Sequence, residues 1–69
     1  MKVTYDASVD VLRILFNDAP IAESDEDKPG VILDYAEDGS IVGMEILDAS
    51  KHMSNPSGVE YAVVGVKSA

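Results

Sequence analysis

Apolar and polar residues alternate along the first part of the chain in the two-residue period of a β-strand. Residues 2–5 follow this pattern, and residues 6–10 are small and acidic residues that suit a turn. Residues 11–16 are rich in β-branched and aromatic side chains, with Arg13 as their one charged residue. The pattern predicts a first antiparallel hairpin, whose second strand is apolar on both sides.

The middle of the chain predicts further strands separated by turns. Residues 17–20 contain Asn, Asp and Pro and favour a chain reversal, and the acidic residues 21–27 fit an exposed edge strand or a loop, of which we favour the strand. Residues 31–35 and 41–47 are apolar runs joined by residues 36–40, where Gly39 suits the left-handed position of a type I turn with a G1 bulge. A second hairpin is therefore expected.

The turn sets the expected register of this second hairpin. If Ala36 lies opposite Ser40, then Ile32 faces Met44, and one side carries Gly30, Ile32, Asp34, Val42, Met44 and Ile46. The other side then carries Val31, Leu33, Tyr35, Ile41, Gly43, Glu45 and Leu47. Both sides hold several large apolar residues, so we expect a partner to cover the second face.

The last third of the chain predicts one helical turn and one more strand. Asp48 and Ser50 are candidate caps for a helical turn near residues 49–53, and residues 59–66 alternate like a final strand. The sequence thus predicts a mainly β fold, a small antiparallel hairpin or meander sheet, in a single domain of residues 1–69.

The size and charge of the chain limit the kinds of function and partner that it can have. A chain of 69 residues buries a small core, and with no cysteine and one histidine it lacks the usual disulfide or metal reinforcement, which favours a homo-oligomer, with a dimer as the first expectation. The net charge of −8 disfavours nucleic-acid binding and allows a basic protein partner. No apolar run is long enough for a membrane span, and the N-terminus does not follow the signal-peptide pattern, so a cytoplasmic location is expected.

Few residues suggest chemistry. Asp6 and Asp10 flank one turn and are weak candidates for a divalent metal, although Asp commonly caps turns and that role is favoured about four to one. His52 has no second histidine or cysteine beside it, and no serine lies in a nucleophile motif. The sequence indicates no catalytic residue and no cofactor, and we lean towards a protein that is not an enzyme.

The order of several short segments resembles a known family. The start Tyr5-Asp6-Ala7-Ser8-Val9-Asp10-Val11-Leu12-Arg13-Ile14 and the later Gly43-Met44-Glu45-Ile46-Leu47-Asp48-Ala49-Ser50 are similar to the small bacterial and archaeal family of unknown function DUF2283. The resemblance covers residues 1–51 and implies a compact β-rich domain. Because members are sometimes encoded beside small putative ribonuclease toxins, it also implies an antitoxin-like role as an alternative.

The leading hypothesis is a non-enzymatic, homo-oligomeric protein-interaction module. The alternatives are an antitoxin-like partner of a small basic ribonuclease-type toxin and a weak divalent-metal-binding domain. The expected interface is an apolar sheet face, made from Leu12, Ile14, Phe16, Val31, Leu33, Tyr35, Ile41 and Leu47.

Overall fold

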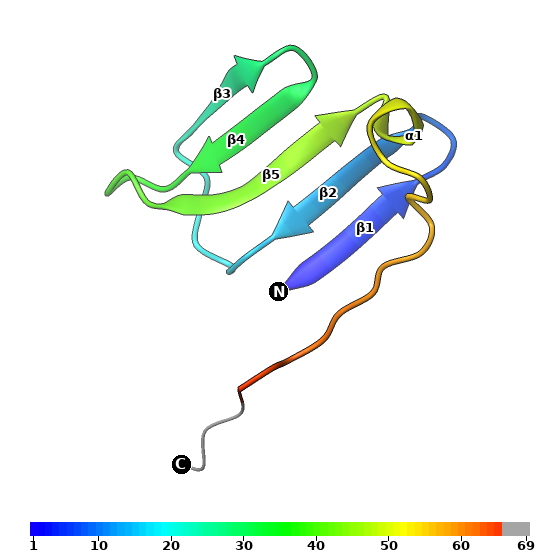
Figure 1. Ribbon diagram of the computed structural model, residues 1–69. Coiled ribbons are helices and arrows are strands. Elements are labelled where there is room, and N and C mark those ends of the chain that lie inside the picture. The colour runs from blue at the N-terminus through cyan, green and yellow to red at the C-terminus, as the bar shows by residue number, and fades with distance from the viewer. Residues whose placement is uncertain (66–69) are drawn as a thin grey trace.

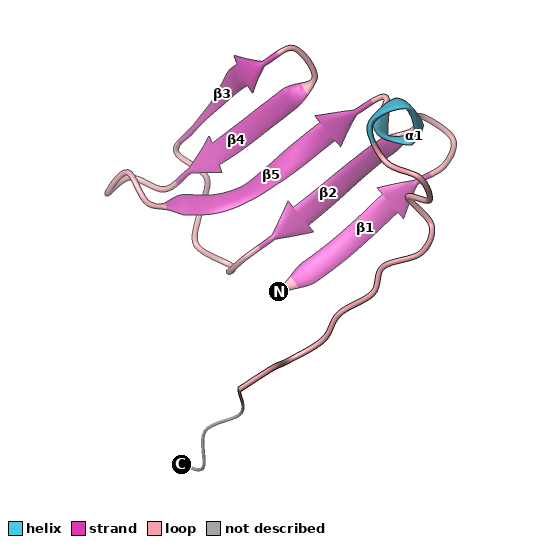
Figure 2. Ribbon diagram, viewed as in Figure 1, coloured by secondary structure: helices cyan, strands magenta, loops and turns pink. Residues whose placement is uncertain are grey.

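The computed structural model describes residues 1–65, and this part of the chain forms a single β-sheet with one short helix (Figures 1 and 2). The strands follow the predicted alternation closely. The elements are β1 (Lys2–Asp6), β2 (Val11–Leu15), β3 (Glu23–Lys28), β4 (Val31–Tyr35), β5 (Ile41–Leu47) and α1 (Ala49–His52). The mainly β fold with one helical turn is confirmed.

The five described strands lie in the order β1-β2-β5-β4-β3, and all neighbours are antiparallel. The chain reverses after β2 as expected, but it then crosses to the far edge of the sheet, where β3 begins (Figure 1). Strands β3, β4 and β5 return as consecutive hairpins and place β5 in the centre, beside β2. This is a Greek-key order rather than a simple meander.

Directly opposed residues form rows across the sheet, and the rows define its two faces. The apolar face contains the rows Val3–Ile14–Met44–Leu33 and Tyr5–Leu12–Ile46–Val31. The mixed face contains the rows Lys2–Leu15–Gly43–Asp34, Thr4–Arg13–Glu45–Ile32 and Asp6–Val11–Leu47. From β1 to β4, one face is thus almost free of polar side chains, while the other combines charged and apolar ones; on β3, Asp25 and Lys28 lie opposite Leu33 and Val31.

A bulge in β5 overturns the expected faces of the second hairpin. The turn itself is as predicted, because Ala36 N donates to Ser40 O at 2.8 Å and Gly39 has a φ of +86°. The register then shifts between Asp34 and Tyr35, so that Val42 has no partner on β4. Every pair beyond the bulge moves by one residue, and a shift of one exchanges the two faces. The predicted pairing of Ile32 with Met44 is therefore wrong, and Leu33 pairs with Met44 instead.

The close approach of β2 and β5 explains the glycine beside the bulge. A Cβ at Gly43 would collide with the backbone oxygen of Ile14 and lie 3.2 Å from Cδ2 of Leu15. A glycine inside a strand commonly marks such an approach. Gly43 therefore lets Leu15 lie over the backbone of β5 on the mixed face.

The short helix begins as predicted, but its cap is supplied by another part of the chain. Asp48 has left-handed backbone angles and its side chain makes no capping bond, which corrects its predicted role. Instead, Ala49 N donates to the carbonyl of Asp10 at 2.9 Å, and Ser50 N donates to the Asp10 carboxylate at 3.0 Å. Asp10 thus satisfies two free N–H groups of the first turn.

The predicted last strand does not form within the described residues. Residues 59–65 make no strand, and Val66 lies outside the described part of the chain. The segment leaves α1 and runs down beside β1, past the start of that strand (Figure 1). Its pattern is that of a strand, but no neighbouring strand in residues 1–65 pairs with it.

Candidate interaction surface

The apolar face is the most conspicuous surface of the molecule, because little of it is covered. Among residues 1–65, only three hydrophobic residues have less than a tenth of their surface exposed, namely Leu12, Val42 and Ala49. Most members of the apolar face are half-buried, and Val3 is 38% exposed. The sheet has no second layer on this side beyond the short helix at one end (Figure 2).

The predicted interface residues fall into three groups. Leu12, Ile14, Val31 and Leu33 lie together in the two rows of the apolar face. Phe16, Tyr35 and Ile41 lie at the end of the sheet next to the bulge, where Phe16 N donates to Val42 O at 2.8 Å and Tyr35 pairs with Ile41. Leu47 pairs with Val11 on the mixed face, away from the other seven.

Four members of the apolar face are missing from the predicted interface: Val3, Tyr5, Met44 and Ile46. Val3 and Tyr5 follow from the alternation of the first strand, since they lie opposite Ile14 and Leu12. To place Met44 and Ile46 on this face, one has to know where the bulge lies. Gly43 was the available signal, because an isolated glycine within a strand indicates a bulge or a close backbone contact.

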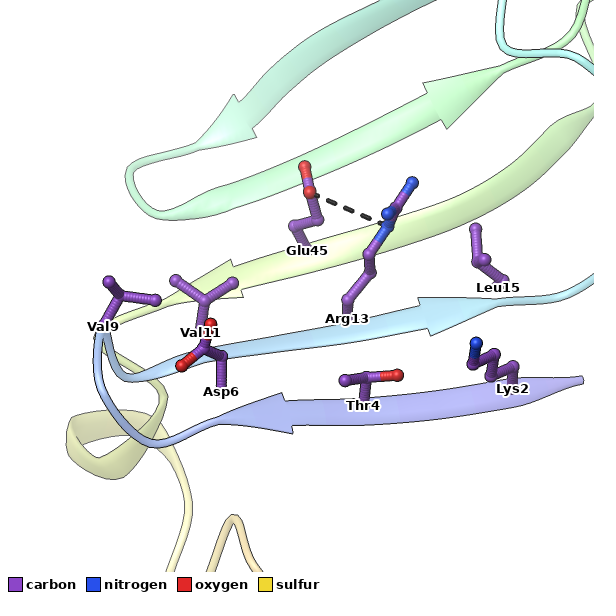
Figure 3. A pocket seen from close by; sticks show the side chains of 8 residues that line it. All are labelled: Lys2, Thr4, Asp6, Val9, Val11, Arg13, Leu15 and Glu45. Atoms are coloured by element: carbon purple, nitrogen blue, oxygen red, sulfur yellow. Dashed lines mark ion pairs between the residues drawn. The ribbon is translucent and has the colours of Figure 1, made fainter.

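The mixed face holds a shallow, open depression over β1, β2 and β5 (Figure 3). Lys2 and Thr4 line it from β1, Arg13 lies across its middle, and the Arg13 Nε atom is 3.8 Å from Oε1 of Glu45. Both side chains of this pair are partly exposed, so the ion pair contributes little to stability. Glu45 lies on β5, the central strand of the five.

Asp34 is the one buried polar residue among the described positions, at 2% exposure. It lies on the mixed face in the row of Gly43, and Ser24 of β3 donates its hydroxyl to Oδ1 at 2.6 Å. The Oδ2 atom accepts no hydrogen bond from any residue in the described range. Ser24 therefore provides the protein donor that makes burial of this carboxyl tolerable.

Asp6 and Asp10, the candidate metal ligands, are both engaged in hydrogen bonds. Asp6 Oδ1 accepts from the backbone N and the hydroxyl of Ser8, at 3.0 and 2.6 Å. Asp10 Oδ1 accepts from the hydroxyl of Tyr5 at 2.7 Å, and Asp10 Oδ2 accepts from the hydroxyl of Ser50 at 2.6 Å. Asp10 thus joins β1, the first turn and α1.

These hydrogen bonds shift the titration of the groups that make them. The hydrogen bond donated by Ser50 lowers the pKa of Asp10 most, and the one donated by Tyr5 lowers it further. The hydrogen bond from Tyr5 to Asp10 in turn raises the pKa of Tyr5. Donation from Ser8 lowers the pKa of Asp6 in the same way. Both carboxylates therefore stabilise turns in their charged form.

No group of three metal-ligating side chains occurs among residues 1–65. His52 lies exposed in α1. Glu23, Asp25, Glu26 and Asp27 lie along β3, an edge strand on which every residue is exposed. We call β3 the acidic edge.

The comparisons with known proteins identify a family and name no activity. Residues 2–50 match the model of a family described as "Protein of unknown function (DUF2283)", and these residues include all five described strands. No curated protein and no solved structure shows a significant match. Within the described residues, no helix has the length and apolar character needed to cross a membrane.

Proposed function

Since the chain belongs to the DUF2283 family, whose description assigns no activity, we propose from its surface that it is a non-enzymatic interaction module that functions as a homodimer. The observation that carries the proposal is the open apolar face. Of the eight large side chains in its two rows, only Leu12 is buried within the monomer, and the other seven remain partly or largely exposed. A contiguous apolar patch of this kind marks a contact surface.

A second copy fits this face better than a charged partner does. From β1 to β4, the two rows of the face contain no charged side chain, so two copies can stack without burying an unpaired charge. A basic protein would gain no electrostatic attraction there, although the chain carries a net charge of −8. Two sheets packed face to face also form the usual core of a β-sandwich, with side chains interdigitating across about 10 Å.

The area of the face is compatible with a modest dimer. The four strands of the apolar face, spaced about 4.8 Å apart and about five residues long, cover roughly 300 Å² in plan. A stable interface usually buries about 800 Å² on each partner, and the side-chain surface exceeds the plan area. The face therefore supplies part of a dimer interface, and contacts outside it would supply the remainder.

Light scattering after size exclusion, combined with thermal melting at several concentrations, tests the homodimer. We expect twice the mass of the chain and a melting temperature that rises with concentration, because dissociation is coupled to unfolding. A monomeric mass together with a melting temperature independent of concentration would remove the proposal.

The acidic edge favours a second candidate, an antitoxin-like partner of a small basic ribonuclease-type toxin. All six residues of β3 are exposed and four of them are acidic, so a basic surface would be attracted to this edge. Co-purification with a basic protein encoded in the neighbouring gene is the test. Binding that weakens steeply with salt and is lost in a Glu23→Lys, Asp25→Lys variant would support this candidate, and no binding at low salt would remove it.

A further inference from the structure

The C-terminal segment, residues 59–65, has the pattern of a strand without a strand partner. Val59, Tyr61 and Val63 alternate with Glu60 and with small or apolar residues, which is the period of an extended strand. Their exposed fractions are 63%, 74% and 64%, and Val64 reaches 92%. A segment with this many exposed β-branched side chains is costly to leave in water.

The segment lies beside its own β1 but does not join it. Met1, Val3, Val59 and Tyr61 line one shallow depression, so the two stretches are close there. Nevertheless, no backbone hydrogen bond connects residues 59–65 with β1 in the described part of the chain. In Figure 1 the segment runs down beside β1 at a distance from it and continues beyond the start of that strand.

The two edges of the sheet differ in whether they can accept a strand. The acidic edge carries four carboxylates on six exposed residues, which repel an incoming strand. At the other edge, β1 carries one positive and one negative charge, at Lys2 and Asp6, with Val3, Thr4 and Tyr5 between them. The outer backbone groups of β1 are therefore open to pairing.

We propose that the C-terminal segment of one copy adds as a strand to the β1 edge of a second copy. The proposal rests on the homodimer proposed above and supplies the part of the interface that the apolar face lacks in area. Because Val3 belongs to the apolar face, a strand at this edge extends that face rather than forming a separate contact. Backbone pairing provides affinity, and the alternating valines and Tyr61 provide the side-chain contacts.

Disulfide trapping between two chains separates this arrangement from pairing within one chain. The sequence contains no cysteine, so a Val3→Cys chain and a Tyr61→Cys chain, carrying tags of different size, form disulfides only through the introduced residues. On mixing and oxidation, we expect a covalent product of the two differently tagged chains. A Val3→Cys, Tyr61→Cys double variant that closes only within one chain, with no mixed product, would overturn the proposal.

A substitution in the segment gives an independent readout. Val63→Pro removes a backbone donor, and Val63→Thr retains both the donor and the β-branched shape. We expect Val63→Pro to raise the dissociation constant of the dimer about tenfold, the equivalent of one or two lost hydrogen bonds, and Val63→Thr to leave it almost unchanged. A dimer that is equally stable in both variants would contradict strand addition while leaving the homodimer intact, whereas a monomeric wild-type protein would remove both proposals.

Discussion

The two faces of the sheet are made from the same strands, yet they are suited to different surroundings. On the mixed face, Arg13 and Glu45 pair at the surface, and Lys2 and Asp6 point towards water around a shallow depression (Figure 3). On the apolar face, the opposite residues of the same strands are hydrophobic from β1 to β4. Strand alternation creates this contrast together with the bulge at Val42, which brings Met44 and Ile46 onto the apolar face. The contrast directs the search for a partner to one side of the sheet.

The largest effect is expected from a charge placed on one face or the other. Ile14 and Leu15 are neighbours on β2, both are half-buried, and they point to opposite faces. Ile14→Asp should raise the dissociation constant of the dimer by about 100-fold or more, because an unpaired charge would be buried at the interface. Leu15→Asp should leave the dimer in place, and sedimentation equilibrium measures both.

Circular dichroism of the same two variants controls for folding, since each substitution also perturbs the monomer. Equal loss of the dimer in both variants, with the sheet retained, would mean that the two faces do not differ in function.

The next prediction concerns the close contact of β2 and β5 on the mixed face. Gly43→Ala should lower the free energy of unfolding by about 1–3 kcal/mol, because the added methyl group must displace the backbone oxygen of Ile14 and also presses on the side chain of Leu15. Urea denaturation measures the change. Gly39→Ala is a useful comparison, as Gly39 has open space around it and only its positive φ opposes substitution. An unchanged stability of Gly43→Ala would contradict the observed approach of the two strands.

A smaller loss is expected when the buried carboxyl on the mixed face loses its donor. Ser24→Ala should lower the free energy of unfolding by roughly 1–2 kcal/mol, because it leaves Asp34 without a hydrogen bond from the protein. Ser40→Ala removes a hydroxyl hydrogen bond of the same length, 2.6 Å, but to the exposed Asp38. It should therefore lower the free energy of unfolding by less. Chemical denaturation measures both variants. A larger loss of unfolding free energy for Ser40→Ala than for Ser24→Ala would contradict the importance given to the buried hydrogen bond.

Acid should weaken the links made by Asp10. Its folded pKa is lower than the unfolded value, so its stabilisation is complete above the unfolded pKa of about 3.9 and disappears as the pH falls through the folded value. Asp10→Asn should melt at a lower temperature at neutral pH and lose less stability than the wild type between about pH 5 and pH 2. If the stabilities of the two proteins fell in parallel with pH, the stabilising role of the charged Asp10 carboxylate would be contradicted.

The smallest effect is expected from divalent cations. Calcium, magnesium or manganese should leave the melting temperature unchanged, because the carboxylates of Asp6 and Asp10 already accept hydrogen bonds from Ser8, Ser50 and Tyr5. A true site would stabilise the fold by about 2.7 kcal/mol at 100 times its dissociation constant. A rise in melting temperature that Asp10→Asn abolishes would show that a metal competes for these oxygens.

The sequence predicted the strands well because their signals are local. Alternation located β1, β2 and β4 to within a residue, and the turn at Gly39 has the predicted hydrogen bond between Ala36 and Ser40. The acidic residues 21–27 correctly indicated an edge strand, which the structure places at Glu23–Lys28. These features depend on neighbours in the chain, and the sequence contains all of them.

The failures involve contacts between distant residues. The bulge at Val42 depends on how β5 fits against β2 and β4 together, and it moved Met44 and Ile46 to the face opposite to the one expected. The cap of α1 comes from Asp10, 40 residues before Ser50. The unpaired state of residues 59–65 likewise depends on the availability of a neighbouring strand, which composition does not reveal.

An isotope-filtered nuclear Overhauser experiment on a mixture of carbon-13-labelled and unlabelled chains tests the central claim most directly, because it records only contacts between copies. We expect cross-peaks between chains from the methyl groups of Ile14, Met44 and Leu33, and none from Val11, Leu15 or Ile32 on the mixed face. Contacts between chains that arise only from the mixed face, or none at millimolar concentration, would contradict it.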